Sequence, residues 1–291
     1  MFKDQLEIKI QYIETALNEL FLDDQSSPYY KLLCESMRYS LMSGGKRLRP
    51  VILVEVAEIL GGNKEIATHL ACALEMIHTY SLIHDDLPAM DDDAMRRGKA
   101  SNHIAFGEDI GILAGDGLLN GAYELMFNKV LKNALTQENL MACSTVSNAA
   151  GSKGMILGQV ADIKATSRTR ETLDYINRNK TGALLNAAFV AGGYIAETDK
   201  IETLTLIGDN LGKAFQIQDD VLDVIGDEML LGKPIGSDDK NNKDTYVTLL
   251  GVEGAKVAYN KCYEICIKEL ETIPNSEFLI NLIRYLMNRT H

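Results

Sequence analysis

The chain has 291 residues, of which 46% are hydrophobic and 24% are charged, and its formal net charge is −12. This length and composition are typical of a globular protein with one large domain or two smaller ones. The negative charge argues against nucleic acid as a partner, because phosphate backbones are bound by basic surfaces. A small phosphorylated ligand is still compatible with it, since a metal ion or a basic cluster can reverse the charge locally.

Cysteine usage and hydropathy indicate the compartment. The five cysteines form neither a C-x-x-C pair nor a zinc-type spacing, and an odd number without a disulfide framework is typical of the reducing cytoplasm. The N-terminus mixes charged and apolar residues at helical spacing, unlike a targeting sequence. The longest mostly apolar stretch, LLNAAFVAGGYIA, is shorter than the roughly 20 residues of a membrane helix. We therefore expect a cytoplasmic protein without membrane insertion.

Apolar residues recur at spacings of three and four along almost the whole chain, which is typical of amphipathic helices. Period-two alternation between hairpin turns, the signal of strands, is absent. The pattern predicts helices over residues 3–21, 29–42, 50–60, 64–86, 109–132, 137–164, 170–196, 201–227, 246–271 and 276–289. With no low-complexity linker or repeat between them, these helices predict a single all-α domain over residues 1–291.

A first group of carboxylates follows the helix predicted over 64–86, in the stretch IHDDLPAMDDDAMRRG. His78 and Asp85 are seven residues apart, so they nearly eclipse each other about 10 Å apart along a helix. Pro88 has no N–H and disfavours helix at the residue before it, so the backbone should loosen there. This loosening could let Asp85 and Asp91 converge on one ion.

A second group of carboxylates lies in FQIQDDVLDVIGD. Gln216, Asp219, Asp220 and Asp223 follow a spacing of three, four and seven residues, so they share one face of a helix. A solvated acidic face is the simplest interpretation of one such stripe. The rest of this helix is apolar, however, and buried carboxylates are avoided unless they are paired or hold a metal.

Two oxygen-only groups on separate helices favour Mg²⁺, with Mn²⁺ as a possible substitute, over zinc. Neither has the spacing of a calcium-binding EF-hand. Because Mg²⁺ usually shares one or two carboxylates with substrate phosphates, the arrangement predicts a phosphate-bearing ligand between the groups.

Basic residues are interleaved with the acidic groups. A single exposed basic loop is usually only solvated, but four of them beside two metal-type groups favour two diphosphates, one held on metal ions and one on bare Lys and Arg. The basic residues concerned are Lys46, Arg47, Arg49, Arg96, Arg97, Lys180 with its neighbour Thr181, Lys233 and Lys243.

The motifs GGKRLRP, DDLPAMD, NKTGALL, FQIQDDVLD and GKPIGSDDKNNKDTY resemble, in order and spacing, those of the trans-isoprenyl diphosphate synthases, or polyprenyl synthetases. The two residues inserted in the first aspartate motif make the sequence most similar to the bacterial farnesyl diphosphate synthase (geranyltranstransferase) type. The resemblance implies an all-α fold around a deep central cavity, a homodimer and three Mg²⁺ ions. It also implies head-to-tail 1'-4 condensation of isopentenyl diphosphate with dimethylallyl or geranyl diphosphate.

The resemblance also implies roles for individual residues. By motif, Asp85 and Asp91 hold two Mg²⁺ ions with Asp86 in support, and Asp219 holds the third with Asp220 and Asp223 nearby. The isopentenyl diphosphate would bind to Lys46, Arg49, His78 and Arg97. The allylic diphosphate would bind to Arg96, Lys180, Thr181, Gln216 and Lys233, with Lys243 nearby. We expect carbonyl and amide dipoles at Lys180, Thr181 and Gln216 to face the allylic cation.

Product length in this family depends on bulk just before the first aspartate motif, where Tyr80 and Ser81 stand. One isoprene unit and one helical turn both measure about 5 Å, so a tyrosine there predicts a C15 product, farnesyl diphosphate. Helix geometry puts Ser81, rather than Tyr80, on the side of Asp85, so the floor assignment rests on the resemblance. Plain core packing of Tyr80 is the alternative.

Three other functions stay open. A geranylgeranyl diphosphate synthase shares every motif and differs in tunnel depth. A terpene cyclase or head-to-head synthase needs no second diphosphate on Lys46, Arg49 and Arg97. A non-catalytic diphosphate-binding subunit should have lost aspartates from one of the two groups, and both are complete here.

Overall fold

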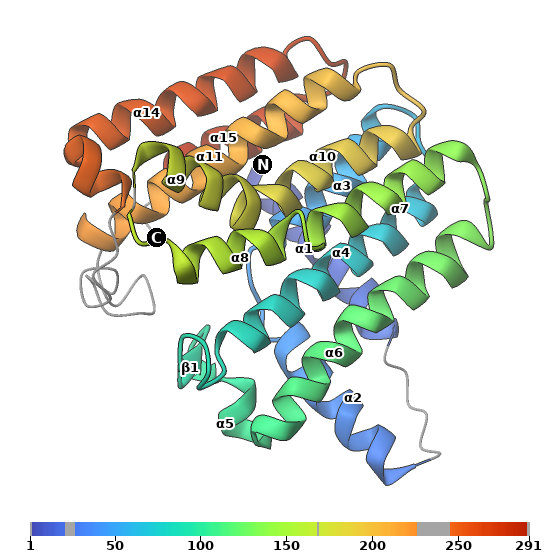
Figure 1. Cartoon of the computed structure of the whole chain (residues 1–291). Coiled ribbons are helices and arrows are strands. Elements are labelled where there is room, and N and C mark those ends of the chain that lie inside the picture. Colours follow the sequence, from blue (N-terminus) through green and yellow to red (C-terminus); the bar gives the residue numbers. More distant parts are fainter. Residues whose placement is uncertain (1, 21–26, 168, 226–244, 290–291) are drawn as a thin grey trace.

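The computed structural model describes residues 2–20, 27–167, 169–225 and 245–289. Long helices make up nearly all of this part of the chain, and Figure 1 shows most of them running in roughly aligned layers. The α-helices are α1 (Phe2–Glu19), α2 (Pro28–Leu41), α3 (Leu48–Ile59), α4 (Lys64–Asp85), α5 (Asn102–Phe106), α6 (Glu108–Leu125), α7 (Gln137–Ala150), α8 (Met155–Lys164), α9 (Arg170–Asn177), α10 (Ala183–Ile195), α11 (Ile201–Ile225), α14 (Tyr246–Leu270) and α15 (Glu277–Met287). The predicted all-α class is confirmed.

Helix α10 lies at the centre of the layers and packs on α3, α7 and α11. Its sequence, ALLNAAFVAGGYI, is apolar on most faces, and ten of its residues are buried. This agrees with the burial that such a composition predicts. One large hydrophobic core joins α10 to residues of α1, α2, α3, α4, α6, α7, α11, α14 and α15, and a smaller cluster links α9, α11 and α14. The predicted domain limits, 1–291, stay a prediction.

The helix predicted over 137–164 is wrong in one respect, because the chain breaks it into α7 and α8. Gly151 takes an extended backbone conformation, and its N–H turns back to the carbonyl of Asn148. The amide of Gly154 then bonds to the carbonyl of Gly151 before α8 begins. Two glycines in four residues thus end one helix and start the next, although the apolar spacing runs through the break.

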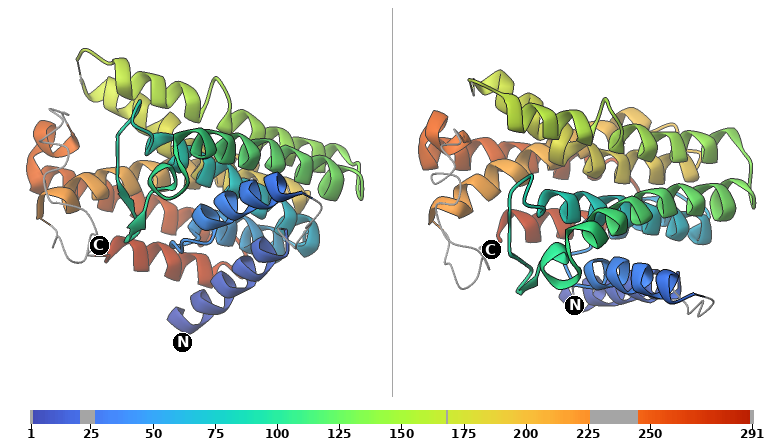
Figure 2. Two further views of the ribbon diagram at one scale, coloured as in Figure 1. Left: turned by 90° about the horizontal axis from the view of Figure 1, so that it is seen from below. Right: turned by 60° about the horizontal axis from the view of Figure 1, so that its bottom comes forward.

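The structure also contains a small hairpin where no strand signal was found. Strand β1 (Met95–Arg96) pairs antiparallel with β2 (Lys99–Ala100), with Met95 opposite Ala100 (Figure 2). Its turn residues Arg97 and Gly98 have φ of 52° and 75°, the left-handed conformation that two-residue hairpin turns require. Strands of two residues are too short to show alternation, so the turn alone could have signalled the hairpin.

Two π-helical turns interrupt the α-helices, η1 (Met126–Leu131) and η2 (Arg178–Gly182). The second lies inside the helix predicted over 170–196 and contains Lys180 and Thr181. Helix α8 crosses so closely here that a Cβ on Gly158 would lie 2.2 Å from the backbone nitrogen of Lys180. π turns occur mostly as single bulges inside α-helices and are frequent at functional sites. The turn η2 therefore marks Lys180 and Thr181 as candidate functional residues.

Candidate active site

Helices α4 and α11 carry the two acidic groups near their C-terminal ends, and both ends lie on the same side of the molecule as the β1–β2 hairpin (Figures 1 and 2). We call Asp85, Asp86 and Asp91 the first acidic cluster, and Asp219, Asp220 and Asp223 the second acidic cluster. The basic cluster consists of Lys46, Arg49, His78 and Arg97.

The end of α4 builds the first acidic cluster. The helix begins at Asn63, whose side chain accepts a hydrogen bond from the amide of Ile66, and it ends at Asp85. The loosening predicted at Pro88 is present: the chain turns, and the amide of Asp91 donates to the carbonyl of Asp85 at 2.9 Å. The turn brings the residue Asp91 back to the end of the helix.

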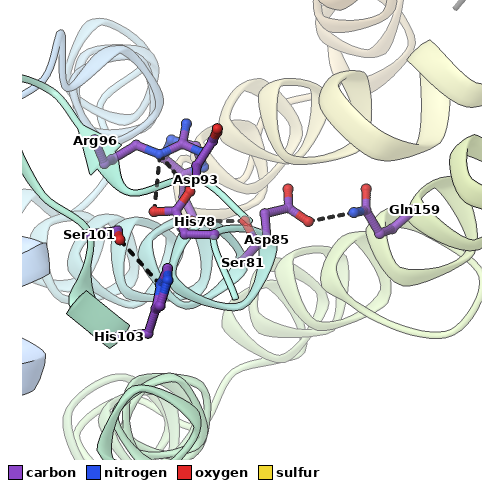
Figure 3. Close-up of polar contacts among 9 residues, drawn as sticks. His78, Ser81, Asp85, Asp93, Arg96, Ser101, His103 and Gln159 are labelled. Carbon is purple, nitrogen blue, oxygen red and sulfur yellow. Dashed lines mark hydrogen bonds and ion pairs between the residues drawn. The ribbon is translucent and has the colours of Figure 1, made fainter. Parts of the chain in front are cut away.

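Asp85 reaches across to α8, where its carboxylate accepts a hydrogen bond from the side-chain amide of Gln159 (Figure 3). Burial raises the pKa of Asp85, and the charges of Asp91 and Asp86 raise it further against the opposing effects of Lys180 and Arg96. The net effect is a raised pKa, because Lys180 and Arg96 do not outweigh burial and the neighbouring carboxylates. A cation placed here would therefore be stabilised.

Asp86 is committed to a protein partner. Its side chain is buried, and Arg96 of β1 donates to it through Nε at 2.9 Å and through Nη2. Arg96 also lies 3.5 Å from the carboxylate of Asp93 (Figure 3). A carboxylate paired in this way is suited to a supporting role, and the same pair fixes Arg96 at the edge of the cluster.

The second acidic cluster lies on one face of α11, as its spacing predicts. Asp220 accepts hydrogen bonds from the backbone N–H of Tyr246 at 2.9 Å and from the side chain of Gln216 at 3.2 Å. Asp223 is buried as well. The side chain of Asp219 is about 40% exposed, and Arg289 lies 2.5 Å from it. Asp219 is thus the more accessible of these carboxylates.

The π turn η2 presents its residues to both clusters. Lys180 forms an ion pair with Asp162 at 2.8 Å, and the hydroxyl of Thr181 donates to Gln216 at 3.0 Å. Burial lowers the pKa of Lys180, but Asp162 and Asp85 together outweigh it, so that the pKa is raised. Lys180 therefore stays charged, within electrostatic reach of the first acidic cluster.

The basic cluster gathers at the start of α3 and in the middle of α4. The side chains of Arg49 and His78 meet at 3.4 Å, and Arg97 donates to the carbonyl of Gly44. Gly45 has a φ of 124°, which residues with a Cβ rarely adopt, and the guanidinium of Arg97 lies against it. Burial, followed by the charges of Arg49 and Arg97, lowers the pKa of His78 well below its usual range.

Charges connect the three clusters. The charge of Asp219 acts on both Lys46 and Arg49, while burial is the largest influence on either pKa and lowers it. Asp85 in turn acts on Lys180. The structure therefore brings the acidic and basic clusters to one region. Lys233 and Lys243 lie outside the described residues.

The oxygen ligands fit Mg²⁺ shared with a diphosphate better than a cage made by protein alone. Across residues 2–20, 27–167, 169–225 and 245–289, no three carboxylate, imidazole or thiol side chains lie together as a metal site. Mg²⁺ usually takes only one or two carboxylates and completes its shell with waters and substrate phosphates.

Three residues of this region were missed from the sequence: Gln159, Asp162 and Arg289. Gln159 and Asp162 follow Gly158 on α8 and lie one helical turn apart, a spacing that could have placed both on the face toward η2. Arg289 donates to the side chain of Gln218 and to the carbonyl of Phe215, 71 and 74 residues earlier in the chain. No local pattern could have indicated that contact.

The residues predicted to set product length lie on the same helix. Tyr80 is 6% exposed, and its ring meets the ring of His84 edge-on at a centroid distance of 5.7 Å. Burial raises the pKa of Tyr80 to about 12. The hydroxyl of Ser81 donates to the carbonyl of His78 at 2.8 Å (Figure 3). The bulk before Asp85 is therefore that of Tyr80.

Comparisons with known proteins show what the chain is similar to. The polyprenyl synthetase profile matches residues 30–282. The farnesyl diphosphate synthase of Bacillus subtilis (strain 168) is 44% identical over 247 residues, which cover 84% of this chain and 83% of that protein. The geranylgeranyl diphosphate synthase of Cyanophora paradoxa is 42% identical over 287 residues, covering 97% and 94%. The solved apo structure of an FPP/GFPP synthase from Zymomonas mobilis superposes with a TM-score of 0.85 at 30% identity and covers 98% of both chains.

Proposed function

The chain belongs to the polyprenyl synthetase family, and from this we propose that it condenses isopentenyl diphosphate head-to-tail with dimethylallyl or geranyl diphosphate to give farnesyl diphosphate. The observation that carries the proposal is the juxtaposition of two acidic clusters with a basic cluster. Asp219 acts electrostatically on Lys46 and Arg49, while Asp85 acts on Lys180. One diphosphate held on metal ions by the acidic clusters, and a second diphosphate held by Lys and Arg of the basic cluster, would account for all three clusters.

The allylic diphosphate is the group that must leave, and the residues around it stabilise its negative charge. We assign Asp85, Asp91 and Asp219 as the carboxylates that hold Mg²⁺, with Asp86, Asp220 and Asp223 in support. Bound Mg²⁺ would supply Lewis-acid stabilisation of the leaving diphosphate. Three ions, with Mn²⁺ as a possible substitute, are part of the proposal.

Arg96 and Lys180 add fixed positive charge where the departing oxygens develop negative charge. Stabilisation of charge that appears in the transition state is usually the largest catalytic contribution. Arg96 is held by Asp86, and Lys180 by Asp162, so neither side chain needs to reorganise as the allylic C–O bond breaks. Lys233 and Lys243, outside the described residues, complete the proposed set.

The allylic cation that remains must be stabilised by dipoles, and nucleophiles that would react with it must be absent. Thr181 and Gln216 are joined by a hydrogen bond at 3.0 Å, which fixes both side chains where η2 meets α11. The π turn gives Lys180 and Thr181 a carbonyl pattern different from that of an α-helix. The C4 carbon of isopentenyl diphosphate then attacks the cation, and one proton leaves C2. We propose the released diphosphate as the acceptor of that proton.

Tyr80 supports a C15 product over the C20 product of a geranylgeranyl diphosphate synthase. Its ring is buried on α4, just before the first acidic cluster, and is backed by His84. We predict that Tyr80→Ala extends the product to C20, measured by chromatography of the dephosphorylated prenols. Ser81→Ala is the matched control, because its hydroxyl is tied to the helix backbone and carries little bulk. A C15 product from Tyr80→Ala would place the floor elsewhere.

Pairing of two chains is also proposed, through an apolar surface. Helices α6 and α7 and the turn η1 expose Leu113, Phe127, Leu140 and Met141, each at least 40% accessible. Exposed apolar side chains on neighbouring elements can form an interaction site. We propose a homodimer, which light scattering after size-exclusion chromatography tests.

Nucleic acid is not expected as a partner. No helix among the described residues has the length and apolar character of a membrane span, and the cytoplasmic location stays a prediction.

The decisive experiment is incubation of the chain with isopentenyl and geranyl diphosphate, with and without Mg²⁺, followed by sizing of the products. We expect a C15 product that requires the divalent ion and disappears on chelation. If neither C15 nor C20 forms with Mg²⁺ present, the chain is a non-catalytic diphosphate-binding protein and the proposed activity is wrong.

A further inference from the structure

Arg47 is more deeply buried than its basic neighbours. In the loop GGKRLRP, Lys46 is exposed and Arg49 is half-buried, whereas Arg47 is only 2% exposed. Its backbone is left-handed, with φ of 46° and ψ of 31°, directly before α3 begins. A residue with a Cβ adopts this conformation only when its surroundings hold it there. The loop therefore turns this one side chain inward.

The guanidinium of Arg47 joins three helices. Nη1 donates to Oε1 of Glu75 on α4 at 2.8 Å, and Nη2 donates to the carbonyl of Leu41 at the end of α2 at 2.6 Å. Nε lies 3.5 Å from the carboxylate of Glu14 on α1. Arg47 thus fixes the start of α3 relative to α1, α2 and α4.

Glu75 is the residue that links Arg47 to the basic cluster. It is 2% exposed and lies one helical turn before His78 on α4. His78 in turn meets Arg49 at 3.4 Å. Two residues one turn apart on α4 therefore contact the start of α3. Glu75 holds Arg47 through an ion pair, and His78 contacts Arg49 through its imidazole.

Glu75 also supplies negative charge to a region that is otherwise basic. Burial lowers the pKa of Arg49 and of Arg97, and the charge of Glu75 is the largest effect that opposes this lowering in both. Without Glu75, the three guanidinium groups of Arg47, Arg49 and Arg97 would face one another with less compensation. Both its contact with Arg47 and its charge therefore indicate that Glu75 supports the basic cluster.

We propose that Arg47 and Glu75 form a positioning pair, which sets the orientation of Lys46 and Arg49 for the diphosphate of isopentenyl diphosphate without touching it. This inference rests on the proposed function, because it takes the basic cluster to be the isopentenyl diphosphate site. Sequence reasoning grouped Arg47 with the exposed basic residues. The structure separates it from them by burial and by the buried carboxylate it binds.

The first test is Glu75→Gln, which keeps the shape of the side chain and removes its charge. Hydrogen bonds to charged groups are stronger than neutral ones by an amount that corresponds to about a tenfold change in binding. We expect KM for isopentenyl diphosphate to rise by about tenfold, with KM for geranyl diphosphate unchanged and kcat lowered by no more than about threefold. Calorimetric titration with isopentenyl diphosphate in the absence of metal should show the same loss of affinity.

A buried charge without its partner can destabilise the fold, so a second variant separates stability from positioning. The double variant Arg47→Met/Glu75→Leu replaces the ion pair with apolar side chains, an exchange that often leaves stability unchanged. We expect it to melt near the wild-type temperature and to bind isopentenyl diphosphate as weakly as Glu75→Gln. A double variant with wild-type KM would overturn the inference, because the pair would then serve stability alone.

Glu55→Gln is the matched control. Glu55 is also a buried carboxylate, on α3, and pairs with Lys9 at 2.5 Å, but neither residue belongs to the basic cluster. We expect its KM for isopentenyl diphosphate to stay within about twofold of wild type. An equal rise in Glu55→Gln and Glu75→Gln would show that any buried charge lost from this bundle has the same effect, and the inference would fail.

Lys46→Ala and Arg49→Ala distinguish this inference from the function on which it rests. If both leave KM for isopentenyl diphosphate unchanged, the basic cluster is not the isopentenyl diphosphate site and the assignment of that site is wrong. If both raise KM while Glu75→Gln does not, the site is right and the positioning pair is wrong.

Discussion

The two acidic clusters are balanced by different parts of the chain. In the first acidic cluster, the buried Asp86 is paired with Arg96, only ten residues further along. In the second, Asp220 is held by the amide of Tyr246 and Asp219 lies beside Arg289, which are 26 and 70 residues away. The pairing of Asp86 is therefore local, although Asp85 of the same cluster reaches α8, 74 residues further along. The second cluster depends on α14 and on Arg289.

The two clusters share a division of labour despite this difference. In each, a buried carboxylate accepts hydrogen bonds from protein donors, namely Asp86 and Asp220, and in the second cluster Asp223 is buried as well. Another is positioned near the cations of the site, namely Asp85 and Asp219. Breaking the pairing of a buried carboxylate is strongly destabilising, while a more accessible carboxylate can bind an ion. Spacing along a helix cannot distinguish the two kinds.

The largest effect is expected from Asp85→Asn. The substitution removes a charge from the proposed metal site while keeping the size of the side chain and its hydrogen-bonding capacity toward Gln159. We expect kcat to fall by about a thousandfold, because the leaving diphosphate loses its metal-held stabilisation. Steady-state kinetics with geranyl and isopentenyl diphosphate measure this fall. Asp199→Asn, at an exposed position before α11, should leave kcat unchanged.

Asp219→Asn and Asp220→Asn, on adjacent residues, test the division of labour directly. We expect Asp219→Asn to lower kcat by about a hundredfold. Its loss in the free energy of unfolding should be smaller than that of Asp220→Asn, because Arg289 keeps its hydrogen bonds to Gln218 and Phe215. Asp220→Asn should instead lower the free energy of unfolding by about 1–3 kcal/mol, since a charged acceptor of two buried hydrogen bonds is replaced by a neutral amide. Kinetics and urea denaturation of both variants are needed. Equal effects of the two on kcat and on stability would contradict the distinction.

The smallest effect concerns His78, in the basic cluster beside both acidic clusters. Its pKa is lowered well below 6.5, first by burial and then by Arg49 and Arg97. The unfolded chain takes up a proton near pH 6.5, whereas the folded chain does not. The neutral imidazole therefore contributes stability that is present above pH 6.5 and is lost as the pH falls toward the lowered pKa.

The stability difference between wild type and His78→Asn should follow this loss. We expect it to be constant above pH 7 and to shrink by up to about 1.4 kcal/mol per pH unit below pH 6.5. Urea denaturation between pH 5 and pH 8 measures it. A difference that does not change with pH would mean that the pKa of His78 is the same in the folded and the unfolded protein.

Much of the fold follows from apolar periodicity. The predicted helices over 64–86 and 201–227 coincide with α4 and α11 to within one or two residues wherever the structure describes them. The break at Gly151–Gly154 and the hairpin turn at Arg97–Gly98 were missed, because two glycines in four residues, or one turn dipeptide, leave the surrounding apolar spacing intact. In a sequence, the signal of a short break or turn is weaker than the repeated apolar spacing of a helix.

The site was predictable as a list of residue types more than as a geometry. Helical spacing put Asp219, Asp220 and Asp223 on one face, and Pro88 correctly indicated the turn that brings Asp91 back toward Asp85. The inward turn of Arg47 was not predictable, since a basic residue between two basic residues gives no sign of a left-handed backbone. Likewise, nothing near Asp219 in the sequence indicates that it meets Arg289.

The claim that both acidic clusters bind one metal–diphosphate group is tested most directly by Mn²⁺ binding in the presence of inorganic pyrophosphate, followed by electron paramagnetic resonance. For the wild type, the account predicts Mn²⁺ binding that strengthens when pyrophosphate is added. Asp85→Asn and Asp219→Asn should each abolish this strengthening, because either cluster alone cannot hold the shared group. If each variant instead lost only part of the bound Mn²⁺, and pyrophosphate still strengthened the binding of the rest, the two clusters would be independent sites. That result would contradict the account.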